Sequence, residues 1–593
     1  MRKITLAVPA RAKDALVTGV QGLGCLHVVA AADDPASAPA GGGPDPKDAR
    51  TAERYLADAP YQRPAPRAPR RDGDPAALVR RVLANKQRRR ELLERREELR
   101  ARLDALAPWG EFDLPEAGAL AGRSLWFYAV PRRKLARLAA LDAPWREVAR
   151  SHQTAYVVVI AREQPPADVM PVAPTPADGW GTRALRRALA ETDDALERVE
   201  LARVRLTRAR PAIRRALARM ADADAFRHAR ETMREHEGVA VLQGWAPVTA
   251  VPRLRRFVTG RGAAMLAQPP AADDRPPTLM HNARWTEPGE DLARFYAVPP
   301  ARDWDPSGVL LVSFALFFAA ILSDAGYGAV VAVLAALPFG VWQSAAGARV
   351  RRMTAALGAA AIGFGALAGS YFGLTPPPGS VLGRLHVIDL QDYGGAMQLA
   401  VLMGVGHIVL ANAAAATAHW PRRAARARVG WVLVAAGAYA AWLGREMPGV
   451  AVAGGAVAAA GLLAVAVFRS ERPVRRPVDH LKRAGDGLLG AAQITQLFGD
   501  VLSYLRLFAL GLATAMLASA FNTMAGQAAD SVAGVGVLLA MLVAVIGHAL
   551  TFALAVVSGV VHGLRLNYIE FYGWALNGEG HAFIPLRRTE VAA

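Results

Sequence analysis

The sequence predicts a chain of two parts: a cytoplasmic α+β half whose globular ends are joined by an antiparallel coiled-coil hairpin, then an all-α polytopic membrane domain of eight transmembrane helices. Residues 1–305 hold 51 of the 70 Lys and Arg and 39 of the 51 Asp and Glu, so residues 306–593 keep only 19 and 12. Leucine heptads in the first part and long apolar runs in the second complete the pattern. A purely soluble enzyme is excluded.

Composition excludes several other classes. The net charge of +19 is spread over both halves, and a GC-rich genome explains the excess of 64 Arg over 6 Lys, so we expect no nucleic-acid partner. A single cysteine, Cys25, excludes an internal disulfide and a cysteine-ligated zinc site, and it fits a reducing compartment. Arg11, Lys13 and Asp14 interrupt the first apolar stretch, so we expect no cleaved secretory signal.

The start of the first half predicts a strand at 3–9, a helix rich in alanine and a strand at 26–30. Residues 34–75, rich in Pro and Gly, predict a flexible loop. A second strand, helix, strand unit is predicted at 125–130, from Arg132, and at 156–161, and a further strand at 239–245. We therefore expect the region 1–305 to be a cytoplasmic domain with α+β ends.

Charged segments with helical periodicity adjoin these predicted units in the sequence. Heptad spacing predicts one coiled-coil arm with Leu78, Leu92, Leu99 and Leu106 on its seam. A second arm is predicted from Leu185, Leu189, Leu196, Val199, Leu206, Ile213, Leu217 and Met220. Arginines also fall on the seams, so we expect the arms to need each other in an antiparallel hairpin, with a kink at Pro211. None of the six lysines follows a glycine, so we expect no ATP-binding loop, no cofactor and a purely structural lever.

Eight apolar runs of membrane-spanning length fill the region 306–593. They lie at about 307–323, 325–342, 354–373, 396–418, 429–444, 449–468, 487–522 and 531–573. The even-numbered connections and the C-terminal tail hold 15 Lys and Arg, whereas the odd-numbered connections hold only Arg384 and Arg445. The positive-inside rule therefore places both termini in the cytoplasm. The last two runs exceed the ~20 residues that cross a bilayer, so we expect long, tilted helices.

Polar residues recur along these last two runs. Steps of three and four place one set on a single side of the seventh helix: Gln493, Gln496, Asp500, Ser503 and Arg506. Steps of 3, 7, 4 and 3 define a second stripe in the eighth: His548, Thr551, Ser558, His562 and Arg565. The region therefore carries two polar stripes that end near an arginine.

Insertion of an arginine at the middle of a membrane span costs ~2.5 to 3.5 kcal/mol on the insertion scale. We therefore expect Arg506 to have a partner of opposite charge or a functional role. Asp500 lies six residues earlier, roughly 240° beyond a full turn of an ideal helix, so we expect it to face another side. Glu570 is similarly off-face from Arg565. An internal salt bridge is the alternative, but a carboxylate on another subunit would explain both arginines.

The residues around both arginines resemble a known family. Ser503-Tyr-Leu-Arg-Leu-Phe-Ala-Leu-Gly-Leu-Ala513 and His562-Gly-Leu-Arg-Leu-Asn-Tyr-Ile-Glu-Phe571 look like signatures of the membrane stator subunit of V-type and A-type rotary ATPases, called subunit a or subunit I. Further similar segments lie at 242–247, 277–282, 295–307, 314–328, 369–373, 406–410 and 578–586. Only the Pro/Gly-rich loop lies outside the likeness.

The resemblance implies a stator that couples proton or sodium translocation to ATP synthesis or hydrolysis in a separate soluble head. Arg506 and Arg565 match the family's two interface arginines, which face an ion-binding carboxylate on each subunit of a rotor ring. A cation there favours the ionised carboxylate, by roughly 4 kcal/mol at 4 Å and an effective dielectric near 20. The implied partners are the rotor ring, peripheral stalk and central stalk subunits, within the lipid bilayer of a cell membrane.

Six polar residues are candidates for lining the two ion half-channels, although contacts between helices would explain them equally well. They are Gln493, Gln496, Asp500, Ser503, Ser558 and His562. The chain departs from some relatives at Ala555, where they have glutamate, and at Ala283, where they have proline, and the first departure leaves the exit path open. Asp324 and His407 match family segments, but we interpret them as a turn-capping aspartate and a packing histidine.

Two other functions fit parts of the sequence. A secondary transporter with a cytoplasmic regulatory arm could use Arg506 and Arg565 to bind an anionic solute, but the long coiled-coil arm and the lack of paired broken helices fit it poorly. A structural tether without transport would have little reason to keep Arg506. The choice between proton and sodium and the direction of ATP chemistry stay open.

Overall fold

The computed structural model describes residues 1–29, 45–63, 74–115, 119–166, 169–176, 180–271, 273–531 and 535–589. The chain forms two compact units, one of residues 1–6 with 243–585 and one of residues 7–242 with 586–593. The boundary at residue 305, predicted from composition, stays a prediction.

The first sheet has the strand order β2 (His27–Val28), β7 (Val239–Ala246), β1 (Arg2–Pro9), β8 (Ala264–Gln268), with β6 (Arg234–His236) paired antiparallel to β7. Ile4, Leu6 and Val8 are buried, as the alternation along the first predicted strand requires. Helices α1 (Lys13–Leu23) and α6 (Val251–Thr259) follow β1 and β7 in the sequence. The strands predicted at 3–9 and 239–245 are confirmed, and of the strand predicted at 26–30 the structure has His27–Val28, with residue 30 outside the described residues.

The second sheet has the order β3 (Ser124–Pro131), β5 (Thr154–Ala161), β4 (Trp145–Arg150), with both pairings antiparallel. The helix predicted from Arg132 is a 3-10 helix, Arg132–Ala140, instead of an α-helix. Leu138 is buried, and Leu135 and Leu141 pack against the same core cluster, at the spacing of three residues that a 3-10 helix places on one side.

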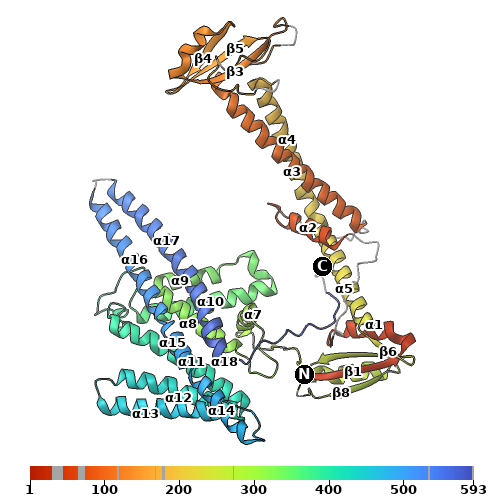
Figure 1. Cartoon of the computed structure of the whole chain (residues 1–593), viewed down its shortest axis with the longest axis vertical. Coiled ribbons are helices and arrows are strands. Elements are labelled where there is room, and N and C mark those ends of the chain that lie inside the picture. The colour runs from red at the N-terminus through yellow and green to blue at the C-terminus, as the bar shows by residue number, and fades with distance from the viewer. Residues whose placement is uncertain are drawn as a thin grey trace. The chain divides into compact units, whose positions relative to one another are not determined.

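Long helices connect to this sheet, and α3 (Pro75–Leu106) lies beside α4 (Thr182–Leu206) (Figure 1). Asn85 donates to the Val199 carbonyl across 3.1 Å, and Arg89 pairs with Glu200. Three of the four leucines predicted on the first seam, at 92, 99 and 106, are buried. A heptad-packed seam along the whole hairpin stays a prediction.

The second arm breaks where proline predicts it. Helix α4 ends at Leu206, a 3-10 turn covers Thr207–Ala209, and α5 (Arg210–Glu231) carries Pro211 in its first turn. Proline is tolerated there because the first amides of a helix have no intrahelical acceptor. The predicted kink is therefore confirmed as a break between two helices.

The flexible loop predicted over 34–75 is wrong for part of its length, because α2 (Pro46–Ala57) forms within it. Asp45 caps this helix by accepting from the Lys47 amide at 2.7 Å, and Pro46 occupies its first turn. Tyr55 and Leu56 are buried beside α3 and α5. Of the predicted loop, residues 34–44 and 64–73 lie outside the described residues.

From residue 287 onward, the unit that contains 243–585 is built from helices. They are α7 (Glu287–Tyr296), α8 (Ser307–Leu322), α9 (Ala325–Ala336), α10 (Ala345–Leu367), α11 (Tyr393–His419), α12 (Arg423–Leu443), α13 (Pro448–Phe468), α14 (Pro477–Ala491), α15 (Ile494–Leu502), α16 (Leu505–Ser531), α17 (Gly536–Arg565) and α18 (Tyr572–Ala575), with a π-helical turn at Leu566–Phe571.

Each of the eight predicted apolar runs contains helix. Among the described residues, four helical stretches are long and apolar enough to cross a membrane, at 393–419, 448–468, 477–531 and 536–575. Helices α8 and α9 are apolar but shorter. The count of eight spans and the positions of the termini therefore stay proposals.

Helices α16 and α17 form an antiparallel pair (Figure 1). Small residues on α17 let it pack closely, since a Cβ on Gly547 would lie 2.2 Å from the Phe521 ring of α16. On α8, Phe318 would lie 2.7 Å from a Cβ on Gly559. The polar stripe of α17 therefore belongs to a helix that packs against both α8 and α16.

Candidate functional site

The seventh apolar run is not one continuous helix, which corrects the single stripe predicted for it. Tight turns separate α14 from α15 and α15 from α16, and at the second the Tyr504 amide donates to Val501 and the Arg506 amide to Ser503, at 3.2 and 3.4 Å. Buried Tyr504 anchors this break, because its hydroxyl lies 2.8 Å from Nδ1 of His407 on α11. Such 3-10 geometry inside a helix often marks a functional position.

The eighth run changes winding directly after Arg565, where α17 gives way to the π-helical turn. Asn567 in this turn accepts from the Ser313 hydroxyl of α8 at 2.6 Å and donates to the Gly563 carbonyl at 2.8 Å. Glu570 is 2 % exposed and lies beside Ser503, within electrostatic range of Arg565 and Asp500. Glu570 is buried whereas Arg565 is exposed, and no ion pair joins them among the described residues, which agrees with the off-face position predicted for Glu570.

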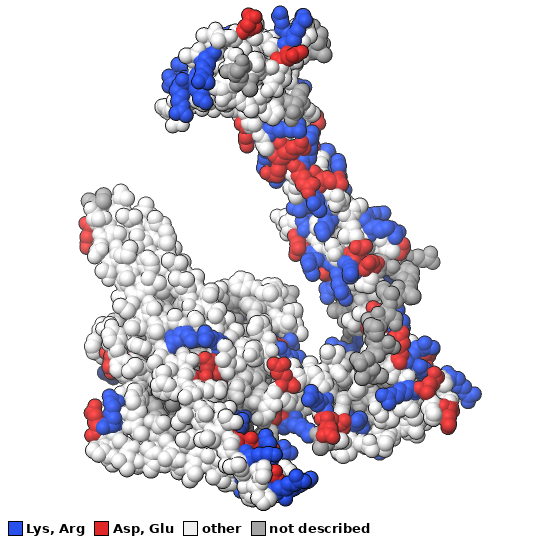
Figure 2. Space-filling model, in the orientation of Figure 1, with Lys and Arg blue, Asp and Glu red and all other residues white. Residues whose placement is uncertain are grey.

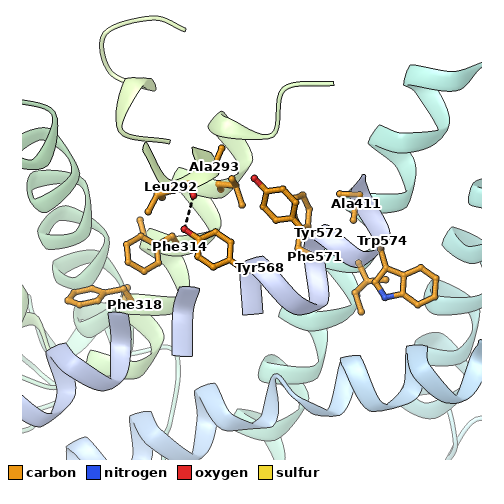
Figure 3. Packing of buried hydrophobic residues seen from close by; sticks show 14 of the residues in the cluster. Leu292, Ala293, Phe314, Phe318, Ala411, Tyr568, Phe571, Tyr572 and Trp574 are labelled. Atoms are coloured by element: carbon orange, nitrogen blue, oxygen red, sulfur yellow. Dashed lines mark hydrogen bonds between the residues drawn. The ribbon is translucent and has the colours of Figure 1, made fainter. Parts of the chain in front are cut away.

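Aromatic side chains pack the π-helical turn into the hydrophobic core (Figure 3). Tyr568 donates its hydroxyl to the Leu292 carbonyl of α7 across 2.7 Å, shown by the dashed line. Phe571 stacks on His407 with ring centroids 4.3 Å apart. Phe314 and Phe318 of α8 lie in the same cluster. This packing gives the π-helical turn a defined position against α7, α8 and α11.

Asp500 does not pair with Arg506. Its carboxylate accepts from the indole N–H of Trp574 at 2.7 Å and lies beside Gln496. The prediction that Asp500 and Arg506 face different sides is confirmed.

His562 lies within electrostatic range of the guanidinium groups of both Arg506 and Arg565. Arg506 is half-buried, and its Nη1 is buried with no hydrogen-bond partner, whereas Arg565 is exposed. Across the described ranges, no ion pair involves either arginine. Figure 2 shows a basic patch with an acidic patch directly beside it on the largely uncharged surface around α16 and α17.

The other candidates fall into two groups. The structure places Asp500, Ser503 and Gln496 on the α15 side, near Glu570 and Trp574, and places His562 with the two arginines. Gln493 and Ser558 are half-buried, and no hydrogen bond of either side chain joins one of these groups in the part of the chain that is described. Their role as channel lining stays a prediction.

The structure supports the structural interpretations of Asp324 and His407. Asp324 caps α9 at the Tyr327 amide and also accepts from the amides of Phe372 and Gly373, each at 2.9 Å. His407 is 6 % exposed and packs between aromatic rings. Ala555, the departure from some relatives, is buried at 3 % exposure.

The spacing of polar residues assigns Glu570 no place in the site and does not single out Trp574. A signal existed for the first, because Glu570 is the only acid in the run 531–573. No spacing rule would have found Trp574, since it meets Asp500 from a separate short helix. The arrangement as a whole combines an unpaired basic cluster with a neighbouring acidic group in an apolar unit.

The curated proteins similar to this chain include several subunit I proteins of V-type and A-type ATP synthases. The V-type ATP synthase subunit I of Chlamydia pneumoniae is 28% identical over 431 residues, covering 59% of this chain and 61% of the relative. The V-type ATP synthase subunit I 1 of Treponema pallidum (strain Nichols) is 28% identical over 408 residues, covering 66% and 61%. The A-type ATP synthase subunit I of Methanocaldococcus jannaschii is 23% identical over 385 residues, covering 58% and 54%.

The chain thus spans 54% to 61% of the length of these relatives. No family model matches it. A solved structure titled as the cytoplasmic N-terminal domain of subunit I, homolog of subunit a, of V-ATPase is 16% identical, with a TM-score of 0.23. It covers 45% of this chain and 100% of that chain, and at this score the likeness carries no argument.

Proposed function

The chain is a relative of the subunit I proteins of V-type and A-type ATP synthases, and on that premise we propose that it is the membrane stator of a rotary ATPase. In this role it couples the movement of protons or sodium ions past a rotor ring to ATP synthesis or hydrolysis in a separate head. The chain itself supplies no nucleotide chemistry.

One observation carries the proposal: the half-buried Arg506 keeps a buried Nη1 without a hydrogen-bond partner. A buried guanidinium nitrogen without a partner is costly, and an arginine inside an apolar span is retained when it has a task. A carboxylate of a ring subunit would pair with this guanidinium through the nitrogens that are not buried. Arg565 lies exposed beside His562 and provides a second cation for the same carboxylate.

The two arginines act on the ring carboxylate by charge. Their positive potential favours the ionised carboxylate, so the bound ion leaves as that ring subunit passes. They also block direct ion flow between two aqueous half-channels, so ions travel around with the ring. Asp500 and Ser503 beside Glu570 belong to the cytoplasmic half-channel, and His562 and Ser558 line the path near the arginines.

The topology that suits this role has eight spans and cytoplasmic termini. The distribution of basic residues across the connections supports it. The charged hairpin of α3, α4 and α5, with its sheet, docks on peripheral and central stalk subunits and resists the torque of rotation. The helices of the other unit contact the rotor ring and the lipid bilayer.

Transport by assembled complexes tests the proposal. Arg506→Ala is expected to leave the ring co-purifying with the chain but to abolish ATP-driven ion uptake into inverted vesicles. Arg506→Lys is expected to be nearly as damaging, because an ammonium lacks the planar fork and holds water more tightly. Arg565→Ala should be milder.

Arg445→Ala is the matched control, because Arg445 is an exposed arginine of the same unit at the end of α12. Its transport rate should equal that of the unmodified complex. Full transport by assembled Arg506→Ala complexes would show that Arg506 is only structural and would contradict the stator assignment.

A further inference from the structure

A chain of hydrogen bonds joins α9, α17 and α16 at the end of the pair far from Arg506. The Tyr327 hydroxyl lies 2.7 Å from Nδ1 of His548, and Nε2 of His548 lies 3.0 Å from the amide oxygen of Asn522. The Asn522 amide nitrogen donates to the Phe372 carbonyl at 2.8 Å. Three polar side chains from distant segments therefore form one connected path.

The pattern of hydrogen bonds determines which atom donates and which accepts in each of them. The Asn522 nitrogen is a donor, so its oxygen must accept from Nε2–H of His548. With Nε2 protonated, the neutral ring has a bare Nδ1, which accepts from the Tyr327 hydroxyl. His548 thus stands with one nitrogen ready to gain a proton and the other ready to release one.

A rigid loop fixes this arrangement. Asp324 accepts from the Ser370 hydroxyl at 2.6 Å and from two loop amides, and the loop carries Phe372 at a φ of 52°. The Phe372 ring also packs edge-on to His548 at 6.0 Å. Asp324 is therefore a positioning residue that holds the carbonyl on which Asn522 depends.

The network lies on the opposite side of the apolar unit from the breaks at α15. Asn522 follows Arg506 by 16 residues of one helix, which is ~24 Å of rise. From His548, the polar side chains of Thr551, Ser558 and His562 lead back along one side of α17 toward Arg565. Thr551 is 1 % exposed and lies beside Tyr327.

We propose that Tyr327, His548 and Asn522 form a proton relay in the non-cytoplasmic half-channel, so that the ion carried is a proton. This inference rests on the proposed stator function. A hydronium ion at the end of the path that faces the ring gives a proton to Tyr327 and becomes water, as the phenolic proton of Tyr327 passes to Nδ1 of His548. His548 then releases the Nε2 proton to a water molecule, which becomes hydronium, and the remaining ring proton moves from Nδ1 to Nε2 by tautomerisation, so one proton enters and one leaves.

The chemistry of the network selects the proton over sodium. Imidazole and phenol exchange protons along hydrogen bonds, which is the usual work of polar residues inside a membrane. A hard cation such as sodium needs several oxygen ligands at once. The network offers two side-chain oxygens, the hydroxyl of Tyr327 and the amide oxygen of Asn522. The second already accepts a hydrogen bond from His548.

The test is ATP-driven acidification of inverted vesicles that contain the assembled complex. Tyr327→Phe keeps the ring that packs on Phe372 and Phe552 and removes only the relaying hydroxyl, so we expect a loss of about tenfold or more. Tyr439→Phe is the control, because that hydroxyl of α12 makes only a long contact of 3.5 Å. It should acidify at the unmodified rate.

His548→Ala should also lose acidification, and added imidazole should restore part of it by entering the space left by the ring. Recovery by imidazole separates a relay from a bond that merely holds helices together. If His548→Ala fails to assemble, Tyr327→Phe decides alone.

Three results would overturn the relay: acidification by Tyr327→Phe at the control rate, no recovery of assembled His548→Ala by imidazole, or ATP-driven sodium uptake in place of acidification. Arg506→Ala in the same assay distinguishes the two proposals. If it still blocks transport while Tyr327→Phe does not, only the relay is wrong.

Discussion

The indole N–H of Trp574 donates to a carboxylate oxygen of Asp500 across 2.7 Å, so that α18 is joined to α15 over 74 residues of sequence. Trp574 is 3 % exposed and packs edge-on against Trp431 of α12 at 5.1 Å. The bond therefore ties a half-channel candidate to the end of the eighth run.

Trp574→Phe should destabilise this end of the unit. The change keeps an aromatic ring but leaves the half-buried Asp500 without its indole donor, which costs ~1 to 3 kcal/mol. Thermal unfolding of the purified chain in detergent measures the loss. Trp285→Phe, at a side chain that is 69 % exposed, should leave the midpoint unchanged. Equal midpoints for the two variants would contradict the prediction.

Gly365→Ala should disrupt the packing of α10 on the start of α9. A Cβ at this position would lie 2.1 Å from the Ala325 nitrogen, and backbone cannot move aside as a side chain can. Overpacking of this kind typically costs ~1 to 3 kcal/mol. Gly363→Ala, two residues away with nothing within 4 Å, is the control and should be neutral or slightly stabilising. Monodispersity and unfolding midpoint in detergent distinguish them.

Arg203→Ala should loosen α2 from the long hairpin. The buried guanidinium donates twice to the Tyr55 carbonyl, at 3.1 and 2.8 Å, and stacks 4.3 Å from the Tyr55 ring. Loss of bonds to a charged group, with the carbonyl left unpaired, costs ~2 kcal/mol, or roughly 30-fold in local opening. Hydrogen exchange of the α2 amides measures it. The exposed Arg198→Ala on the same helix should leave exchange unchanged.

Accessibility tests the proposed topology in a chain whose Cys25 has been replaced by serine. A cysteine at Gln391, an exposed position between α10 and α11, should react with a membrane-impermeant maleimide added to intact cells. A cysteine at Val474, 37 % exposed between α13 and α14, should not react until the cells are opened. Labelling of both from outside would defeat the arrangement derived from basic residues.

Several features could be predicted because they depend on local chemistry. Alternation placed the strands at 3–9 and 156–161, and the fixed φ of Pro211 placed the break between α4 and α5. Hydropathy located the helices of the apolar unit, and spacing on an ideal helix separated Asp500 from Arg506. The resemblance of the segments around Arg506 and Arg565 pointed to the relatives found by comparison.

Tertiary structure decided what the spacing could not. The break at Tyr504 and the π-helical turn after Arg565 depend on contacts with His407 of α11 and Ser313 of α8, far away in sequence. They bring Glu570 to Ser503 and Trp574 to Asp500, neither of which an ideal helix predicts. The sequence alone determined which residues carry charge in an apolar chain. Which of them meet was decided by packing, because packing can change the winding of a helix and hence the direction of every side chain beyond it.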